Sequence, residues 1–254
     1  MNLAVLKRRR PMRQRRIVPN PRDPEIRLPL RTELFLIAHS DETGRNHLSR
    51  KALNLGLAGA VLMELSLTER IQIGKQYRIR DGGYVKDTGR ITIIDPEFYG
   101  DPLTDQAMKL IRTTGGRFHA SEFIDQFATP DLYDRVQGDM LATGVLKREI
   151  HRRFGLFRRE VYSPVDGRHP IQIRSKVRDL ANPRHPDDPG FELPNIQTVA
   201  LAGLVAALGL ARHLYHSDPA ILHMKLMDLI HRLYDNTIRD VYAAINPAKR
   251  RRVR

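Results

Sequence analysis

Two stretches of the chain are apolar on nearly every helical face, and they restrict the fold more than any other feature. Residues 53–63 read Leu-Asn-Leu-Gly-Leu-Ala-Gly-Ala-Val-Leu-Met, and residues 199–210 are twelve apolar residues in succession. A helix without a polar face is buried on all sides, and the small residues Gly56, Ala58, Gly59 and Ala60 allow its neighbours to approach closely. The second stretch is shorter than the ~20 residues that a membrane-spanning helix needs. Both stretches therefore predict central helices of a bundle.

The other periodic segments predict further helices and two small antiparallel strand pairs. Hydrophobic spacing indicates helices at about 30–38, 49–65, 101–112, 121–127, 131–143, 171–180, 196–213 and 218–246, the last being one or two helices. Alternating residues at 70–73, 77–80 and 90–94 favour a β-ribbon, and those at 145–149 and 156–162 favour a hairpin. The predicted fold is mainly α: a single-domain helical bundle with a small β-ribbon and a protruding β-hairpin.

Residue chemistry predicts several ends of these elements. Ser49 and Ser121 are suitable caps for the helices that follow them, and Gly144 is a suitable C-terminal stop. Glu64 and Glu69 flank the end of the first apolar helix, where we expect them to cap it or to pair with Arg70.

The net charge of +14 is concentrated at the two ends of the chain. Residues 1–22 hold eight Lys/Arg and no acid, and the tail from Ala248 holds five more; removing these thirteen from 43 leaves 30 basic residues against 29 acidic ones. We therefore divide the chain into a basic disordered arm (1–25), a nearly neutral domain (26–246) and a basic tail (247–254). Such arms bind polyanions, either acidic lipid surfaces or nucleic acid, or simply keep a protein soluble.

Catalytic signatures are weak. The sequence has no phosphate-binding GxxxxGK[ST] loop, GxGxxG turn, HExxH helix or GxSxG elbow, and it has no cysteine. Its ten histidines are scattered, so no set of metal ligands is indicated. We expect a protein that is not an enzyme, with no catalytic residues, no metal and no cofactor.

Two groups of basic residues are candidates for binding phosphate. Arg174 and Arg178 are four residues apart and share a helix face, with Lys176 between them. Arg50 and Lys51 begin the first apolar helix, where the free amides also favour an anion. A solvated helix face is the alternative for each group, and a lipid phosphate is favoured only if the two groups lie close together in the fold.

The hairpin tip combines apolar and basic residues. Phe154, Leu156 and Phe157 lie among Lys147, Arg148, Arg152, Arg153, Arg158 and Arg159. Phenyl rings that enter the headgroup layer beside arginines that meet phosphates suit a membrane interface. The alternative is a hairpin packed against the body or against another subunit.

A nucleic-acid-binding protein is the second reading. Residues 121–146 followed by a basic hairpin have the helix-helix-wing order of a winged helix. The second of these helices carries Asp131, Asp134 and Asp139 with only Arg135 as a basic residue, and DNA would repel it.

The order of segments resembles the Golgi phosphoprotein 3 family. The similarity begins with Leu30 to Ala38, continues with Asp41-Glu42-Thr43-Gly44 and the run from Leu55 to Arg70, and extends through the hairpin to the two helices after it. It covers about residues 26–246. The abundance of arginine over lysine is typical of a GC-rich, bacterial genome.

The resemblance implies a peripheral membrane adaptor that binds phosphatidylinositol 4-phosphate and self-associates through its hairpin. It also implies a cytoplasmic location, at the Golgi membrane in a eukaryote, where the family links glycosyltransferases to coat proteins. The lipid pocket of the family has an aromatic residue and an arginine at positions that fall on Ser49 and Ala58 here. General anionic-lipid binding is therefore a safer expectation than strict phosphoinositide specificity.

Overall fold

The structure is a computed structural model, and it describes eight stretches of the chain. These are residues 28–40, 44–80, 83–115, 118–153, 157–181, 195–215, 218–232 and 236–246. The two predicted basic ends, residues 1–25 and 247–254, lie outside the described residues, and so do residues 41–43 of the segment Asp41-Glu42-Thr43-Gly44.

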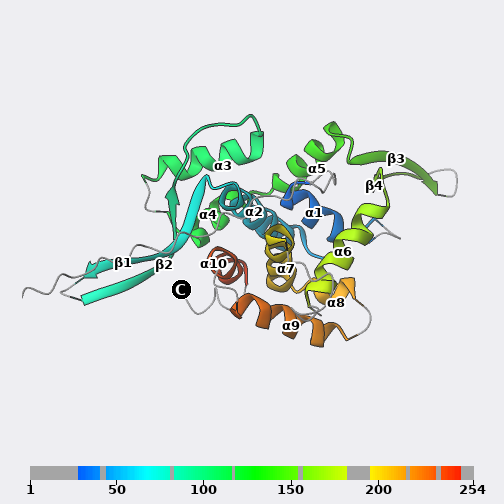
Figure 1. The fold of residues 1–254 in the computed structure, drawn as a ribbon. Coiled ribbons are helices and arrows are strands. Elements are labelled where there is room, and N and C mark those ends of the chain that lie inside the picture. The colour runs from blue at the N-terminus through cyan, green and yellow to red at the C-terminus, as the bar shows by residue number, and fades with distance from the viewer. Residues whose placement is uncertain are drawn as a thin grey trace, which may run out of the picture.

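The described residues form ten helices and two separate antiparallel strand pairs, so the predicted mainly α fold is confirmed (Figure 1). The elements, in chain order, are α1 (Leu30–Ile37), α2 (Arg50–Leu67), β1 (Ile71–Arg80), β2 (Gly83–Ile93), α3 (Pro102–Thr113), α4 (Ala120–Phe127), α5 (Leu132–Ala142), β3 (Leu146–Arg153), β4 (Phe157–Pro164), α6 (Arg168–Leu180), α7 (Ile196–Leu208), α8 (Ala211–Leu214), α9 (Pro219–Arg232) and α10 (Asn236–Ile245).

Helices α2 and α7 form the centre of the bundle, as their apolar sequences predict. Helix α2 packs against α1, α3, α4, α5, α7 and α10. Glycines permit this close packing: a Cβ atom on Gly59 would lie 2.6 Å from Ile245 Cδ1, and one on Gly203 would lie 2.6 Å from Ile238 Cγ2. The predicted role of the small residues in α2 is therefore confirmed.

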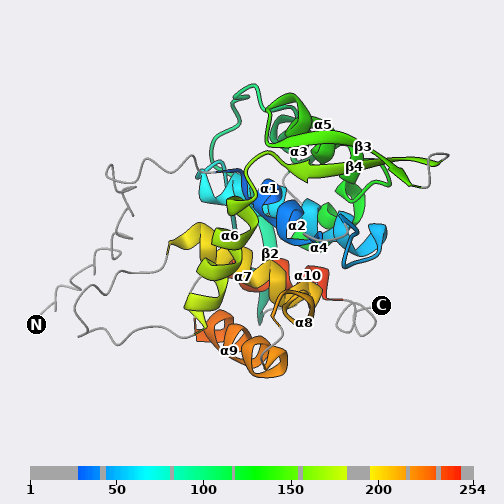
Figure 2. The same ribbon diagram turned by 90° about the vertical axis from the view of Figure 1, so that its right-hand side faces the viewer.

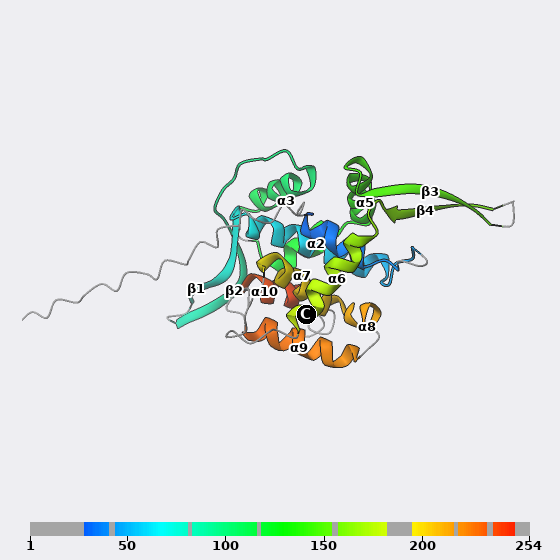
Figure 3. The same cartoon turned by 45° about the vertical axis from the view of Figure 1, so that its right-hand side comes forward.

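Both strand pairs extend away from the helices (Figures 1 and 3). In the ribbon, β1 and β2 pair from Ile71↔Ile93 to Arg80↔Gly83, with a register shift between Gly74 and Gln76. In the hairpin, β3 and β4 pair from Leu146↔Pro164 to Arg153↔Phe157. Each pair begins at the body and is longer than the alternating segments predicted.

Some boundaries differ from the predicted ones for local reasons. Helix α4 begins at Ala120, one residue before the predicted cap Ser121, because the Glu122 carboxylate accepts the His119 N–H at 3.0 Å. The predicted helix 196–213 is divided into α7 and α8 because Gly209 takes a left-handed φ of 67° and ends α7.

Crossing a bilayer takes a long apolar helix, and within the described ranges no helix is both long enough and apolar enough for this.

Candidate functional site

Helix α6 begins directly after the hairpin and lies between the hairpin base and α8 (Figures 2 and 3). Its buried residues Ile173 and Val177 belong to the core, and the helix packs against α1 and α7. Arg168 at its start forms a bidentate pair with Asp166, which lowers the pKa of that carboxyl group to about 2. The rest of the helix presents a polar surface outward.

Arg174 and Arg178 lie on one flank of this surface together with Ile171. Arg178 is exposed, Arg174 is half-buried and Ile171 is 59% exposed. Residues at spacings of three and four share a helix face, so these three side chains form one strip. Lys176 is exposed too, but it is two residues from each arginine and therefore lies on the opposite flank.

Tyr215, directly after α8, connects the strip to the neighbouring helix. Its hydroxyl donates to the carbonyl oxygen of Arg174 at 2.7 Å. Burial raises the pKa of the Tyr215 phenol, the positive charges of Arg178 and Arg174 oppose that rise, and the nearby Asp179 carboxylate adds to it. Both arginines thus lie within electrostatic range of one buried hydroxyl group.

The second predicted group, at the start of α2, is anchored on another side. Arg50 pairs with Asp134 at 2.8 Å, and its guanidinium carbon lies 3.7 Å from the centre of the Tyr133 ring. Its charge is partly balanced there, whereas Lys51 is exposed. Ser49 accepts the Ala52 N–H at 3.2 Å and is the N-cap of α2, as predicted.

Helix α8 and the segment before α2 lie between the two basic groups. The His47 and His213 rings stack with centroids 5.3 Å apart, and Gly44 packs near Val161 of β4. Contacts therefore run from α6 through Tyr215 and His213 to His47, three residues before Arg50. These contacts link α6 to the segment before α2, while Arg50 itself is held by Asp134 and Tyr133 of α5.

An aromatic cluster that was not expected from the sequence supports the start of α2. His39 Nδ1 lies 2.6 Å from the Phe35 carbonyl oxygen, and His39 Nε2 lies 2.8 Å from the Tyr133 hydroxyl. Burial lowers the pKa of His39, so we assign the neutral imidazole that donates to Phe35 and accepts from Tyr133. Phe35 and His39 are four residues apart, but Tyr133 is 94 residues from His39, so sequence spacing does not indicate the cluster.

The predicted hairpin contacts are only partly described. Phe154 and Leu156 lie outside the described residues, and of Phe157 only the backbone at the start of β4 is described. Nearer the body, Lys147 pairs with Glu149 at 2.8 Å and Arg148 with Glu160 at 3.2 Å. Ile150 is 56% exposed on the same hairpin.

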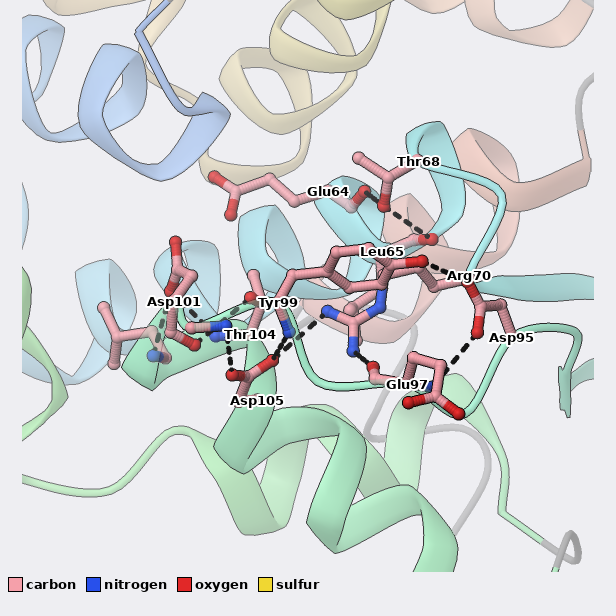
Figure 4. A network of polar contacts seen from close by, with 12 residues as sticks. Glu64, Leu65, Thr68, Arg70, Asp95, Glu97, Tyr99, Asp101, Thr104 and Asp105 are labelled. Atoms are coloured by element: carbon pink, nitrogen blue, oxygen red, sulfur yellow. Dashed lines mark hydrogen bonds and ion pairs between the residues drawn. The ribbon is translucent and has the colours of Figure 1, made fainter.

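A buried ion cluster joins four helices, and it corrects the expected pairing of Glu64. Arg31 is 3% exposed and contacts Glu64, Asp101 and, at 3.5 Å, Asp139. Arg70 instead contacts the Glu97 carbonyl oxygen and Asp105, as Figure 4 shows. The prediction that Glu64 caps its helix or pairs with Arg70 is wrong, because α1 brings Arg31 nearer.

Ser49 and Ala58, the positions at which the resemblance led us to expect a lipid pocket, have structural roles in this chain. Ala58 is fully buried in α2 and packs in the core, and Ser49 is the helix cap described above. Neither position adds a cation to the exposed surface.

The helix-helix-wing order expected of a nucleic-acid-binding protein is present, but the charge of α5 is unsuitable for binding nucleic acid. The buried side of α5 consists of Leu132, Tyr133, Val136 and Met140. Asp134 is exposed, and Asp139 points to Arg31. Helix α5 therefore has no cationic face for a phosphate backbone.

The fold is a helical bundle around two buried apolar helices, with two projecting strand pairs. A basic, partly apolar strip lies on its surface. These features place the chain among the mainly α proteins. Residues 30–244 match the family model described as Golgi phosphoprotein 3 (GPP34), and the chain belongs to this family. None of the curated proteins compared with the chain matches its sequence.

Proposed function

We propose that this chain is a peripheral membrane adaptor that binds anionic lipid headgroups and has no catalytic role. The observation that carries the proposal is the strip of α6, on which Arg174 and Arg178 lie beside the exposed Ile171. The proposal also includes Lys176 on the opposite flank of α6, and Arg50 and Lys51 at the start of α2. Family membership supports the same role, since lipid binding is what the family resemblance implies.

The chemistry of the strip suits a phosphate at a membrane surface. A guanidinium group offers planar, paired donors to phosphate oxygens. An apolar side chain next to it gains free energy by entering the headgroup layer. Val165, directly after β4, is 57% exposed and adds a second apolar side chain between the hairpin and α6.

We further propose general recognition of acidic lipids rather than a strict requirement for phosphatidylinositol 4-phosphate. The buried Ala58 and the capping role of Ser49 leave this chain without the aromatic residue and the arginine of the family pocket. The protein would then act at the cytoplasmic face of an acidic membrane, which is a Golgi membrane in a eukaryote. Self-association through the hairpin tip, Phe154 to Phe157, is part of the same proposal.

The basic ends, residues 1–25 and 247–254, would add long-range attraction to the folded domain. Each cation close to an acidic leaflet contributes about 1 kcal/mol, and salt screens this contribution. We therefore expect removal of residues 1–22 to weaken vesicle binding sharply at low salt and much less at high salt. Co-sedimentation of both chains over a salt series measures the difference.

The direct test compares vesicles of different headgroup. The full chain is mixed with vesicles of neutral phosphatidylcholine alone, or with added phosphatidylglycerol, cardiolipin or a phosphoinositide, and the bound fraction is measured. The proposal expects binding to every acidic vesicle and little to the neutral one. Equal binding to all vesicles, or a gel shift of nucleic acid at physiological salt without vesicle binding, contradicts it.

A further inference from the structure

Residues 94–100, between β2 and α3, present an unusual apolar surface, which we call the aromatic loop. Ile94 is 56% exposed, Phe98 is 51% exposed and Tyr99 is 66% exposed. Three of the large exposed apolar side chains of the described residues thus lie in one short loop. Isolated exposed apolar residues are common, but grouped ones mark a contact surface.

The aromatic loop is held in place from below. Arg70, which is 5% exposed, donates to the Glu97 carbonyl oxygen and contacts Asp105 at 3.5 Å (Figure 4). Asp105 in turn accepts the N–H groups of Tyr99 at 3.1 Å and Gly100 at 2.8 Å. A buried cation and a carboxylate thus fix the loop with its rings exposed. Because the loop is already ordered, a partner that binds the rings loses little conformational entropy.

The chemistry around the rings favours a cationic, apolar partner. Asp95 and Glu97 supply carboxylates within the loop itself, whereas Asp101 and Asp105 beside it pair with Arg31 and Arg70. Both rings already accept arginine: the Arg70 guanidinium lies 4.8 Å from the Tyr99 centroid, and that of Arg112 lies 5.4 Å from Phe98. Arg112 reduces the negative charge at one side, and the Tyr99 hydroxyl donates to Asp95, which lowers the pKa of that carboxyl group. Aromatic faces and carboxylates together recognise arginine next to aliphatic residues.

One segment of the sequence has that composition, and the described chain that follows it starts near the loop. Residues 13–18 read Arg-Gln-Arg-Arg-Ile-Val. The described chain starts at Leu28, three residues before Arg31, and Arg31 contacts Asp101 at the end of the loop. The ten residues from Val18 to Leu28 span up to about 35 Å, which is ample for a return to the aromatic loop.

We propose that residues 13–18 dock on the aromatic loop of the same molecule. Ile17 and Val18 cover Phe98 and Tyr99, and Arg15 and Arg16 face the carboxylates around them. An acidic lipid surface or a nucleic acid is repelled by those carboxylates, so neither competes for the loop itself. Docking does not depend on the proposed function. Docking would also withhold the docked cations from the membrane, and this consequence rests on the proposed function.

The absence of cysteine allows a clean cross-linking test. In the full chain, Asn20→Cys is combined with Pro96→Cys in the aromatic loop, or with Ala220→Cys on α9 as the control. Both of these body positions are exposed. Docking predicts that a short thiol cross-linker joins the 20/96 pair about tenfold faster than the 20/220 pair at low salt, because docking raises the effective concentration.

Two changes should abolish the preference for the 20/96 pair. Raising the salt to about 0.5 M screens the charges, and Phe98→Ala/Tyr99→Ala removes the exposed rings without touching Arg70 or Asp105. The thermal transition of that variant, followed by circular dichroism, shows that the body is still folded. Equal rates for the two pairs, a rate unaffected by the ring variant, or a cross-linked dimer in place of a monomer would each overturn the proposal.

The cross-linking result and vesicle binding are separate measurements. If vesicles are not bound while the 20/96 preference holds, the proposed function fails and the docking stands. If both hold, the ring variant should bind acidic vesicles more strongly than the natural chain, since the cations of residues 13–16 become available.

Discussion

At the scale of single residues, two arginines of this chain differ sharply in how deeply they are buried. Arg31 is enclosed by α1, α2, α3 and α5 and is surrounded by three carboxylates, whereas the Arg50 side chain is 51% exposed beside a 57% exposed Asp134. A buried charge whose partner is removed retains its full desolvation cost. An exposed pair loses little when it is broken, because water replaces the partner.

Arg31→Leu should therefore lower the free energy of unfolding by about 3–5 kcal/mol, since Glu64 is left buried without its cation. Arg50→Ala, the matched control, should cost about 1 kcal/mol or less in the same urea titration. Replacing Arg31 and Glu64 together by leucines should recover a large part of the loss. An Arg31→Leu loss no larger than that of Arg50→Ala would contradict a stabilising role for the buried cluster.

His39 gives the fold a pH dependence of definite sign. Burial lowers its pKa from 6.5, so the unfolded chain binds the proton more readily than the folded one. The stability that His39 contributes is fully present above its unfolded pKa and is lost as the pH falls through its folded pKa. Unfolding free energies measured between about pH 7 and pH 5 should fall more steeply for the natural chain than for His39→Gln. Identical slopes would show that His39 does not titrate as a buried group.

At the scale of elements, apolar composition predicted the central helices and their close packing. The apolar runs at 53–63 and 199–210 have no solvent face, and they became α2 and α7. The α7–α8 break at Gly209 was missed because a left-handed glycine inside an apolar run leaves no signal in hydrophobic spacing.

The candidate site was less predictable than the helices. Spacing placed Arg174 and Arg178 on one face, but the Tyr215 contact and the Arg50–Asp134 pair depend on how distant segments pack. The aromatic cluster of His39 and Tyr133, and the Arg31 cluster, are tertiary features of the same kind.

Two glycines test the packing of these elements against each other. Gly59→Ala places a methyl group 2.6 Å from Ile245 Cδ1 and 3.1 Å from Val241 Cγ1, so we expect a loss of about 1–3 kcal/mol in unfolding free energy. Gly138→Ala in the exposed face of α5 meets nothing within 4 Å and should stabilise by up to about 1 kcal/mol through helix propensity. Chemical denaturation of both variants measures these changes in unfolding free energy. Stabilisation by both substitutions would mean that α2 and α10 are not in close contact.

At the scale of the whole molecule, a nearly neutral body carries local surfaces of opposite character. The α6 strip is basic and partly apolar, while the aromatic loop between β2 and α3 has exposed rings and the carboxylates of Asp95 and Glu97. The strongly basic ends of the sequence have both an acidic membrane and this loop as possible partners. Charge placement, rather than the net charge of +14, is therefore what a functional account of this chain depends on.

The central proposal is that Arg174 and Arg178 meet lipid phosphate, and the most direct test removes them together. In co-sedimentation with phosphatidylglycerol vesicles, Arg174→Ala/Arg178→Ala should reduce binding by about thirtyfold, which corresponds to about 1 kcal/mol for each cation. Lys109→Ala/Lys225→Ala, on α3 and α9, removes the same charge from exposed positions and should change it far less. Equal losses from the two pairs would mean that α6 has no special role and that only the total charge attracts the membrane.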